Sequence, residues 1–160
     1  TTDNIVKAAQ DQQQMFNRNQ IGTGSNFKVA AVDNSVGSMA AAFPLGVVNT
    51  FFRPFPWDVR SPFMVLSFLE SFAFLVLTLM TFRRLGIKKF FGLIASEPVL
   101  SFAFVFAIVF GGFVGMTTGN FGALNRYKIP ALPFYAMAIF LVMDKSGKFS
   151  PQYIFGKKFF

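Results

Sequence analysis

The sequence predicts an all-α membrane protein with about three transmembrane helices, an interfacial or re-entrant helix and an N-terminal surface helix. Three apolar stretches support this prediction, at residues 62–82, 98–116 and 130–143. A helix needs about 20 apolar residues to cross a bilayer, so the third stretch requires Tyr127 and Lys128 to lie among the lipid headgroups, with the lysine extending outward. With 25 phenylalanines and 53% hydrophobic residues among 160, the chain has more apolar surface than a soluble protein of this length can bury.

Charge and missing residue types exclude several classes of function. The net charge is +8 at pH 7, and in so apolar a chain the positive-inside rule and anionic lipids explain this excess better than nucleic acid does. The chain has no cysteine and no histidine, which excludes disulfides, thiolate nucleophiles, imidazole bases and the usual zinc sites. We expect no nucleic-acid partner, no cofactor and no metal site.

The N-terminal third is less apolar and is interrupted. Residues 1–19 are glutamine-rich with a sparse apolar stripe, which predicts a surface helix. Residues 21–38 carry turn formers and are expected to be a loop. Residues 39–52 are apolar but contain Pro44 and Gly46, so we expect a short interfacial or re-entrant helix there.

The basic residues predict an orientation in the membrane. Four of them fall in the expected short loop between the first two spans: Arg83, Arg84, Lys88 and Lys89. The positive-inside rule places this loop and the basic tail, residues 144–160, in the cytoplasm. Residues 1–60 are then a region on the outer face, and residues 61–143 are the transmembrane region.

Four cations depart from this rule and form the predicted binding site. Two precede the first span and two precede the third: Arg53, Arg60, Arg126 and Lys128. Guanidinium and ammonium groups that converge on one face suit an anionic phosphate, with Trp57 and Tyr127 setting the depth in the membrane. The alternative is that these cations contact lipid phosphates or anchor the ends of helices.

Two carboxylates are candidate catalytic residues, each with a structural alternative. Asp58 is the acid of the outer motifs, where it is either a base or a salt-bridge partner of the flanking arginines. Glu70 lies inside the first span, where a carboxylate is costly unless it is paired or lines a polar cavity. Its structural alternative is to accept hydrogen bonds from Ser67, Ser71 or another helix.

The second span contains three glycines, Gly111, Gly112 and Gly115. Small residues at this spacing favour close approach of another helix. We therefore expect a packing role for them, with a hinge as the alternative.

The segments GSNFKV, FRPFPWDVRSPFMVLSFLES and NFGALNRYKIPALPFY resemble the C-terminal part of a bacterial polytopic membrane protein family of surface-glycan gene clusters. The Arg-Tyr-x-x-Pro-x-x-Pro pattern from Arg126 to Pro133 is similar to the start of a late helix in polyprenyl-phosphate-dependent membrane glycosyltransferases and polymerases. The resemblance covers most of residues 24–143. It implies action on a lipid-linked sugar at the outer side of the cytoplasmic membrane, with Arg126 at the lipid phosphate and Arg53 with Asp58 in a matching motif.

The leading hypothesis is a C-terminal fragment or subunit of a bacterial inner-membrane protein of glycan assembly, with its N-terminus outside. Its expected partners are membrane lipid, a polyprenyl-phosphate-linked sugar and further transmembrane helices or subunits. The acidic motif of the first outer loop of such transferases is absent, so whether the chain is an enzyme stays open. The alternatives are a noncatalytic subunit that scaffolds a larger membrane complex and, ranked third, a transporter component.

Overall fold

The computed structural model describes residues 2–18 and 36–147, and every regular element in these ranges is a helix. The elements in chain order are α1 (Thr2–Arg18), α2 (Val36–Phe52), the 3-10 helix η1 (Pro56–Asp58), α3 (Pro62–Leu85), α4 (Ile87–Ser96), α5 (Pro98–Thr117), α6 (Phe121–Tyr127) and α7 (Ala131–Lys145). Two stretches, Met64–Leu85 in α3 and Pro98–Thr117, are long and apolar enough to cross a membrane. A third span exists if α6 and α7, which meet at a bend of 65°, are counted together. The all-helical prediction with two to three candidate spans is confirmed to this extent.

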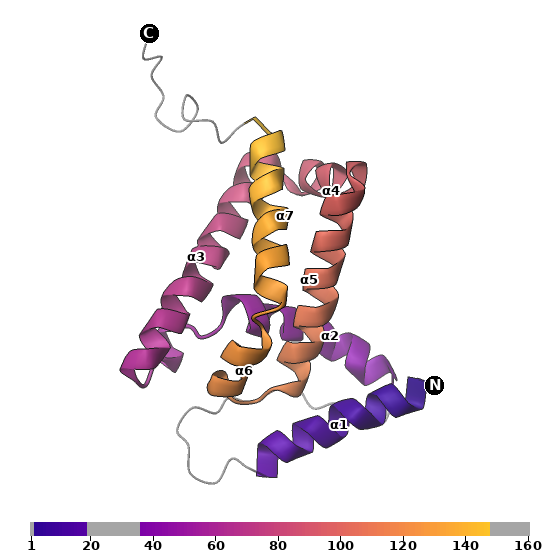
Figure 1. Cartoon of the computed structure of the whole chain (residues 1–160), viewed down its shortest axis with the longest axis vertical. Helices are drawn as coiled ribbons and strands as arrows, with labels where there is room; N and C mark the ends of the chain where they lie inside the picture. The colour runs from indigo at the N-terminus through magenta and orange to yellow at the C-terminus, as the bar shows by residue number, and fades with distance from the viewer. Residues whose placement is uncertain (1, 19–35, 148–160) are drawn as a thin grey trace.

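The three long apolar helices stand side by side, and the shorter helices close the two ends of the bundle. Figure 1 shows α3, α5 and α7 upright, with α1 and α2 crossing one end of the bundle and α4 at the other. We call the first end, which carries η1, α6 and the start of α3, the α6 end. We call the second end, where α3 and α7 finish and α5 begins, the α4 end.

Glycines allow α2 to pack closely against the backbone of α5. A Cβ atom added to Gly115 would overlap the carbonyl oxygen of Gly46, and one added to Gly46 would overlap that of Gly112. Thr50 on α2 donates a hydrogen bond to the carbonyl oxygen of Gly111 at 2.6 Å. The predicted close approach of a helix to these glycines is confirmed, and the approaching helix is α2.

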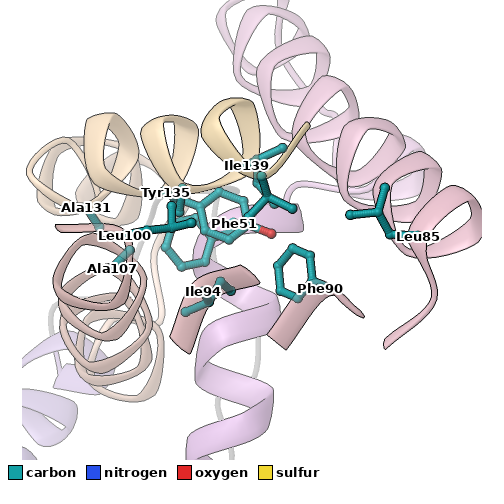
Figure 2. Close-up of a cluster of buried hydrophobic side chains, with 11 residues drawn as sticks. Phe51, Leu85, Phe90, Ile94, Leu100, Ala107, Ala131, Tyr135 and Ile139 are labelled. Atoms are coloured by element: carbon teal, nitrogen blue, oxygen red, sulfur yellow. The ribbon is translucent and has the colours of Figure 1, made fainter. Parts of the chain in front are cut away.

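The main apolar core joins α2 and α7 to the α4 end (Figure 2). The ring of Phe51 on α2 stacks on that of Tyr135 on α7 at a centroid distance of 4.1 Å. The hydroxyl of Tyr135 shares a hydrogen bond with Thr78 on α3 at 2.8 Å, so the core's buried phenol is satisfied. Phe90 on α4 is buried in the same cluster. Leu100 and Ala107 of α5 complete the cluster, so α2, α3, α4, α5 and α7 share one packed interior.

The prediction of a loop between the first two spans is wrong, because ten of its residues form α4. Gly86, at φ +77°, separates α3 from α4 in a backbone conformation that L side chains rarely adopt. Phe90 and Ile94 lie one turn apart and are buried, whereas Lys88 and Lys89 are exposed. This amphipathic spacing stabilises a helix in place of an open loop.

Two further boundaries differ from the predictions. A helix over residues 39–52 is confirmed as part of α2, which continues through Pro44. It starts at Val36, so the expectation that residues 36–38 belong to a loop is wrong. The connection before the third span contains α6, which the side chain of Asn120 caps by accepting hydrogen bonds from the backbone of Gly122 and Ala123. The surface helix expected at residues 1–19 is confirmed as α1. The rest of the predicted loop, residues 21–35, and most of the basic tail, residues 148–160, lie outside the described residues.

Candidate functional site

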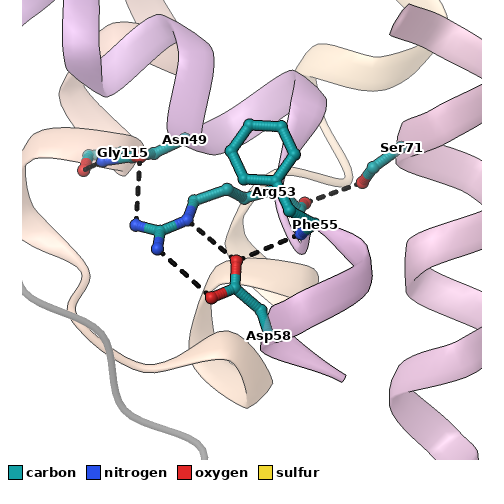
Figure 3. A network of polar contacts seen from close by, with 6 residues as sticks. All are labelled: Asn49, Arg53, Phe55, Asp58, Ser71 and Gly115. Carbon is teal, nitrogen blue, oxygen red and sulfur yellow. Dashed lines mark hydrogen bonds and ion pairs between the residues drawn. The ribbon is translucent and has the colours of Figure 1, made fainter.

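The arginine and the aspartate of the RPFPWD motif face each other at the end of α2. The guanidinium of Arg53 donates to both oxygens of Asp58, at 3.1 and 3.4 Å. The backbone N–H of Phe55 donates to the same carboxylate at 3.1 Å, and Arg53 also reaches the side-chain oxygen of Asn49 at 3.5 Å (Figure 3). Asp58 is only 13% exposed. Of the two roles predicted for Asp58, this geometry favours that of salt-bridge partner.

Helix α3 connects this motif to the Asn-Arg-Tyr-Lys motif that precedes α7. The Ser71 hydroxyl donates to the carbonyl oxygen of Arg53 at 2.7 Å and accepts from the ammonium of Lys128 at 3.3 Å. Lys128 also forms an ion pair with Glu70 at 3.1 Å. One polar network therefore runs from α2 through α3 to the turn before α7.

Lys128 is buried, so the prediction that it extends outward to the headgroups is wrong. Its side chain is 2% exposed, whereas that of Glu70 is 42% exposed. A buried ammonium is costly without a carboxylate, and Glu70 on the neighbouring helix supplies one. Glu70 does receive a partner from another segment, as one of its predicted roles required, but that partner is a lysine.

A second contact brings the two motifs together at the α6 end. The side-chain amide of Asn125 donates to Ser67 at 2.6 Å, and the guanidinium carbon of Arg53 lies 5.7 Å from the centre of the Phe121 ring. The structure thus brings the RPFPWD and Asn-Arg-Tyr-Lys motifs to one place. Arg53 and Lys128 do not add free charge there, because Asp58 and Glu70 already face them.

The remaining predicted residues are at the surface. Trp57 is 74% exposed and stacks on Phe55 at a centroid distance of 4.9 Å. Tyr127 is 52% exposed, and Arg60 and Arg126 are also exposed. These side chains are more accessible to lipid or ligand than those of Arg53 and Lys128.

Arg126 lines a groove of about 540 Å³ that the sequence did not predict. Its guanidinium Nε donates to the carbonyl oxygen of Gly122 at 3.3 Å, and no carboxylate of a described residue lies within ion-pair distance of it. The walls come from α1, from the last turns of α5 and from the bend between α6 and α7. The other lining residues are Ile5, Ala8, Gln12, Phe110, Phe113, Val114, Thr117, Thr118, Tyr127 and Pro130.

An apolar groove of about 690 Å³ continues from there along α5. The two grooves share Phe110 and Phe113 in their walls. The second extends through the phenylalanines and valines of α5 as far as Ser101. The phenylalanine repeat of this span was the available signal, but repetition alone does not distinguish a groove from a lipid-facing surface.

A third groove, of about 850 Å³, lies at the α4 end. Arg83, Lys88 and Lys89 line it together with Leu79, Phe82 and the turn at Gly86. All three cations are exposed. This is the position at which the positive-inside rule places cations beside anionic headgroups.

Comparison of the chain with known protein families, curated proteins and solved structures found no match. The resemblance drawn from the RPFPWD and Asn-Arg-Tyr-Lys segments therefore stays a prediction.

Proposed function

We propose that the chain is a membrane-embedded component of bacterial lipid-linked glycan assembly that holds a polyprenyl phosphate or diphosphate at Arg126. The observation that supports this most is the groove in which an exposed guanidinium stands at one end of a long apolar surface. A cation at one end and an apolar surface along the rest suit an amphiphile with an anionic head and a hydrocarbon tail. The resemblance of the surrounding segments to glycan-assembly proteins supplies the cellular context.

Arg126 is the phosphate ligand in this proposal. A guanidinium donates two parallel hydrogen bonds to phosphate oxygens, and such charge-assisted bonds are stronger than neutral ones. Arg126 suits this role because its charge, unlike those of Arg53 and Lys128, meets no carboxylate of a described residue. Tyr127 beside it has the amphipathic ring favoured at the depth of the headgroups.

The hydrocarbon tail follows α5 from Phe113 towards Ser101. The shared wall at Phe110 and Phe113 makes the two grooves continuous. Aromatic and valine side chains offer the tail a surface without a competing polar group, apart from the hydroxyl of Ser101, which donates to the carbonyl oxygen of Ile94 at 2.7 Å. This proposal assigns binding of the carrier lipid, and no bond-making step, to the chain.

The direct test is lipid binding to the full chain, measured by native mass spectrometry from phosphatidylcholine nanodiscs. We expect Arg126→Gln to weaken binding of a long-chain polyprenyl diphosphate about tenfold or more, the loss of one charge-assisted contact. Neutral polyprenol should bind both proteins equally. Lys7→Gln, which removes an exposed charge of α1 that lines none of the grooves described above, is the matched control and should bind as the wild type does.

Equal diphosphate affinity in the wild type and Arg126→Gln would contradict the proposal. Phosphatidic acid that competed as well as the polyprenyl lipid would contradict the choice of carrier lipid. In cells, Arg126→Gln should abolish lipid-linked glycan turnover while membrane insertion stays intact, as judged from glycan output and from chain recovered in the membrane fraction.

A further inference from the structure

Glu70 is an ionisable residue that the fold satisfies incompletely. It lies eight residues after Pro62, so roughly 12 Å along α3 at 1.5 Å per residue, and inside the apolar stretch Met64–Leu85. Its side chain is 42% exposed, and the partner given to it by the described residues is Lys128. A carboxylate has about four acceptor positions, and Lys128 also donates to Ser71. Much of the acceptor capacity of Glu70 is therefore unused by the described residues, on a side chain that is 42% exposed.

Lipid alone does not suit this face of α3. Acyl chains cannot donate hydrogen bonds, and an exposed carboxylate at membrane depth is costly. The neighbouring exposed residues are Leu66 one turn before Glu70 and Ala73 three residues after it. Such residues give an apolar surface with room beside the carboxylate for a second helix to approach closely.

The outward face of α5 provides the contrast within the same bundle. Its exposed side chains include Phe102, Val105 and Val109, and α5 contains no charged residue. Lipid or a lipid tail satisfies such a surface completely. The acid is what distinguishes the α3 face, because it needs a polar partner.

We propose that the Glu70 face of α3 binds a transmembrane helix of a second protein that presents a hydrogen-bond donor at the depth of Glu70. Suitable donors are the side chains of Gln, Asn, Ser, Thr, Lys or Arg on an otherwise apolar helix. A second copy of this chain is a poorer partner, because a two-fold contact between α3 helices would place two Glu70 carboxylates together. This interface is independent of lipid binding at Arg126.

The test uses the full chain in phosphatidylcholine vesicles and two synthetic helices as probes. One is a lysine-flanked polyleucine helix with a single central Gln, and the other has Leu at that position. Because the chain has no cysteine, a donor fluorophore on Lys89→Cys at the α4 end reports peptide binding by energy transfer. We expect the Gln helix to bind about tenfold more tightly than the all-leucine helix, as one interhelical hydrogen bond allows.

The deciding variant is Glu70→Leu with Lys128→Met, which removes both charges and leaves neither stranded in the bundle. The preference for the Gln helix should disappear in this variant, with helix content unchanged by circular dichroism. Val99→Leu, at an exposed position of α5 outside the apolar groove, is the matched control and should keep the preference. Equal binding of the two peptides to the wild type, or a preference that survives in the double variant, would overturn the proposal.

Discussion

The two ends of the bundle use the same basic residue types in opposite ways. At the α6 end, Arg53 faces Asp58 and buried Lys128 faces Glu70. At the α4 end, Arg83, Lys88 and Lys89 are exposed around a groove. The ion pair between Lys145 and Glu97 at that end is itself well exposed and contributes little to stability. The distribution of cations along the chain therefore predicts its orientation in the membrane. The burial of each cation decides whether it stabilises a contact between helices or is available to a ligand.

The difference has a physical cause in the neighbouring helices. At the α6 end, α2, α3 and the turn before α7 meet, so a lysine there is removed from water and requires a carboxylate. At the α4 end, the amphipathic α4 directs Phe90 inward and leaves its lysines outside. Arg60 and Arg126 resemble the α4-end cations in their exposure although they belong to the α6 end. Of these two, Arg126 lines the groove beside α5, which is why we assign ligand binding to it.

The largest effect expected from this comparison is at the Glu70–Lys128 pair. Glu70→Leu should lower the free energy of unfolding by about 3–5 kcal/mol, because it leaves a buried ammonium without a carboxylate. Lys128→Met should cost less, since the carboxylate of Glu70 is 42% exposed and can reach water at the micelle surface, whereas the ammonium of Lys128 is buried. The double variant Glu70→Leu with Lys128→Met should have a free energy of unfolding close to that of the wild type. Thermal unfolding in detergent micelles measures all three, and equal losses in the two single variants would contradict the burial argument.

A small effect is expected from the corresponding charges at the α4 end. Lys88→Gln with Lys89→Gln should change the free energy of unfolding by less than about 0.5 kcal/mol, because both side chains are exposed. The same variant should reduce the enrichment of phosphatidylglycerol around the chain by about 1 kcal/mol per charge removed. Native mass spectrometry from mixed micelles measures that enrichment at low salt. If the double lysine variant lost stability but kept its bound phosphatidylglycerol, the α4-end lysines would be structural and would not bind lipid headgroups, which would contradict the comparison.

Hydropathy and glycine spacing predicted much of the helical framework. The spans of α3 and α5 follow from the length of their apolar runs. The spacing of Gly111, Gly112 and Gly115 predicted that a helix packs closely against α5, but it did not predict that this helix is α2. The helix α4 was missed because positive charge at a membrane boundary is typical of a loop. Its Phe90–Ile94 spacing was the overlooked signal.

The site was harder to predict because burial is a property of the assembled helices. The sequence predicted that the RPFPWD and Asn-Arg-Tyr-Lys motifs lie on one face, and the structure brings them together. Charge pattern alone did not show that Lys128 is buried while Arg126 is exposed. Ser71 is the residue that joins the two motifs, and a serine inside an apolar span carries no sign of that role. The contribution of α1 to the Arg126 groove likewise depends on a contact between segments about a hundred residues apart.

The central claim is that both outer motifs share one aqueous surface, opposite the α4 end. Single cysteines at exposed Trp57, at exposed Tyr127 and at Lys89, in this cysteine-free chain, test it directly with a maleimide that cannot cross the bilayer. In sealed vesicles of one orientation, Trp57→Cys and Tyr127→Cys should be labelled from the same side, and Lys89→Cys should be labelled only after the vesicles are opened. Labelling of Trp57→Cys and Tyr127→Cys from opposite sides would contradict the account.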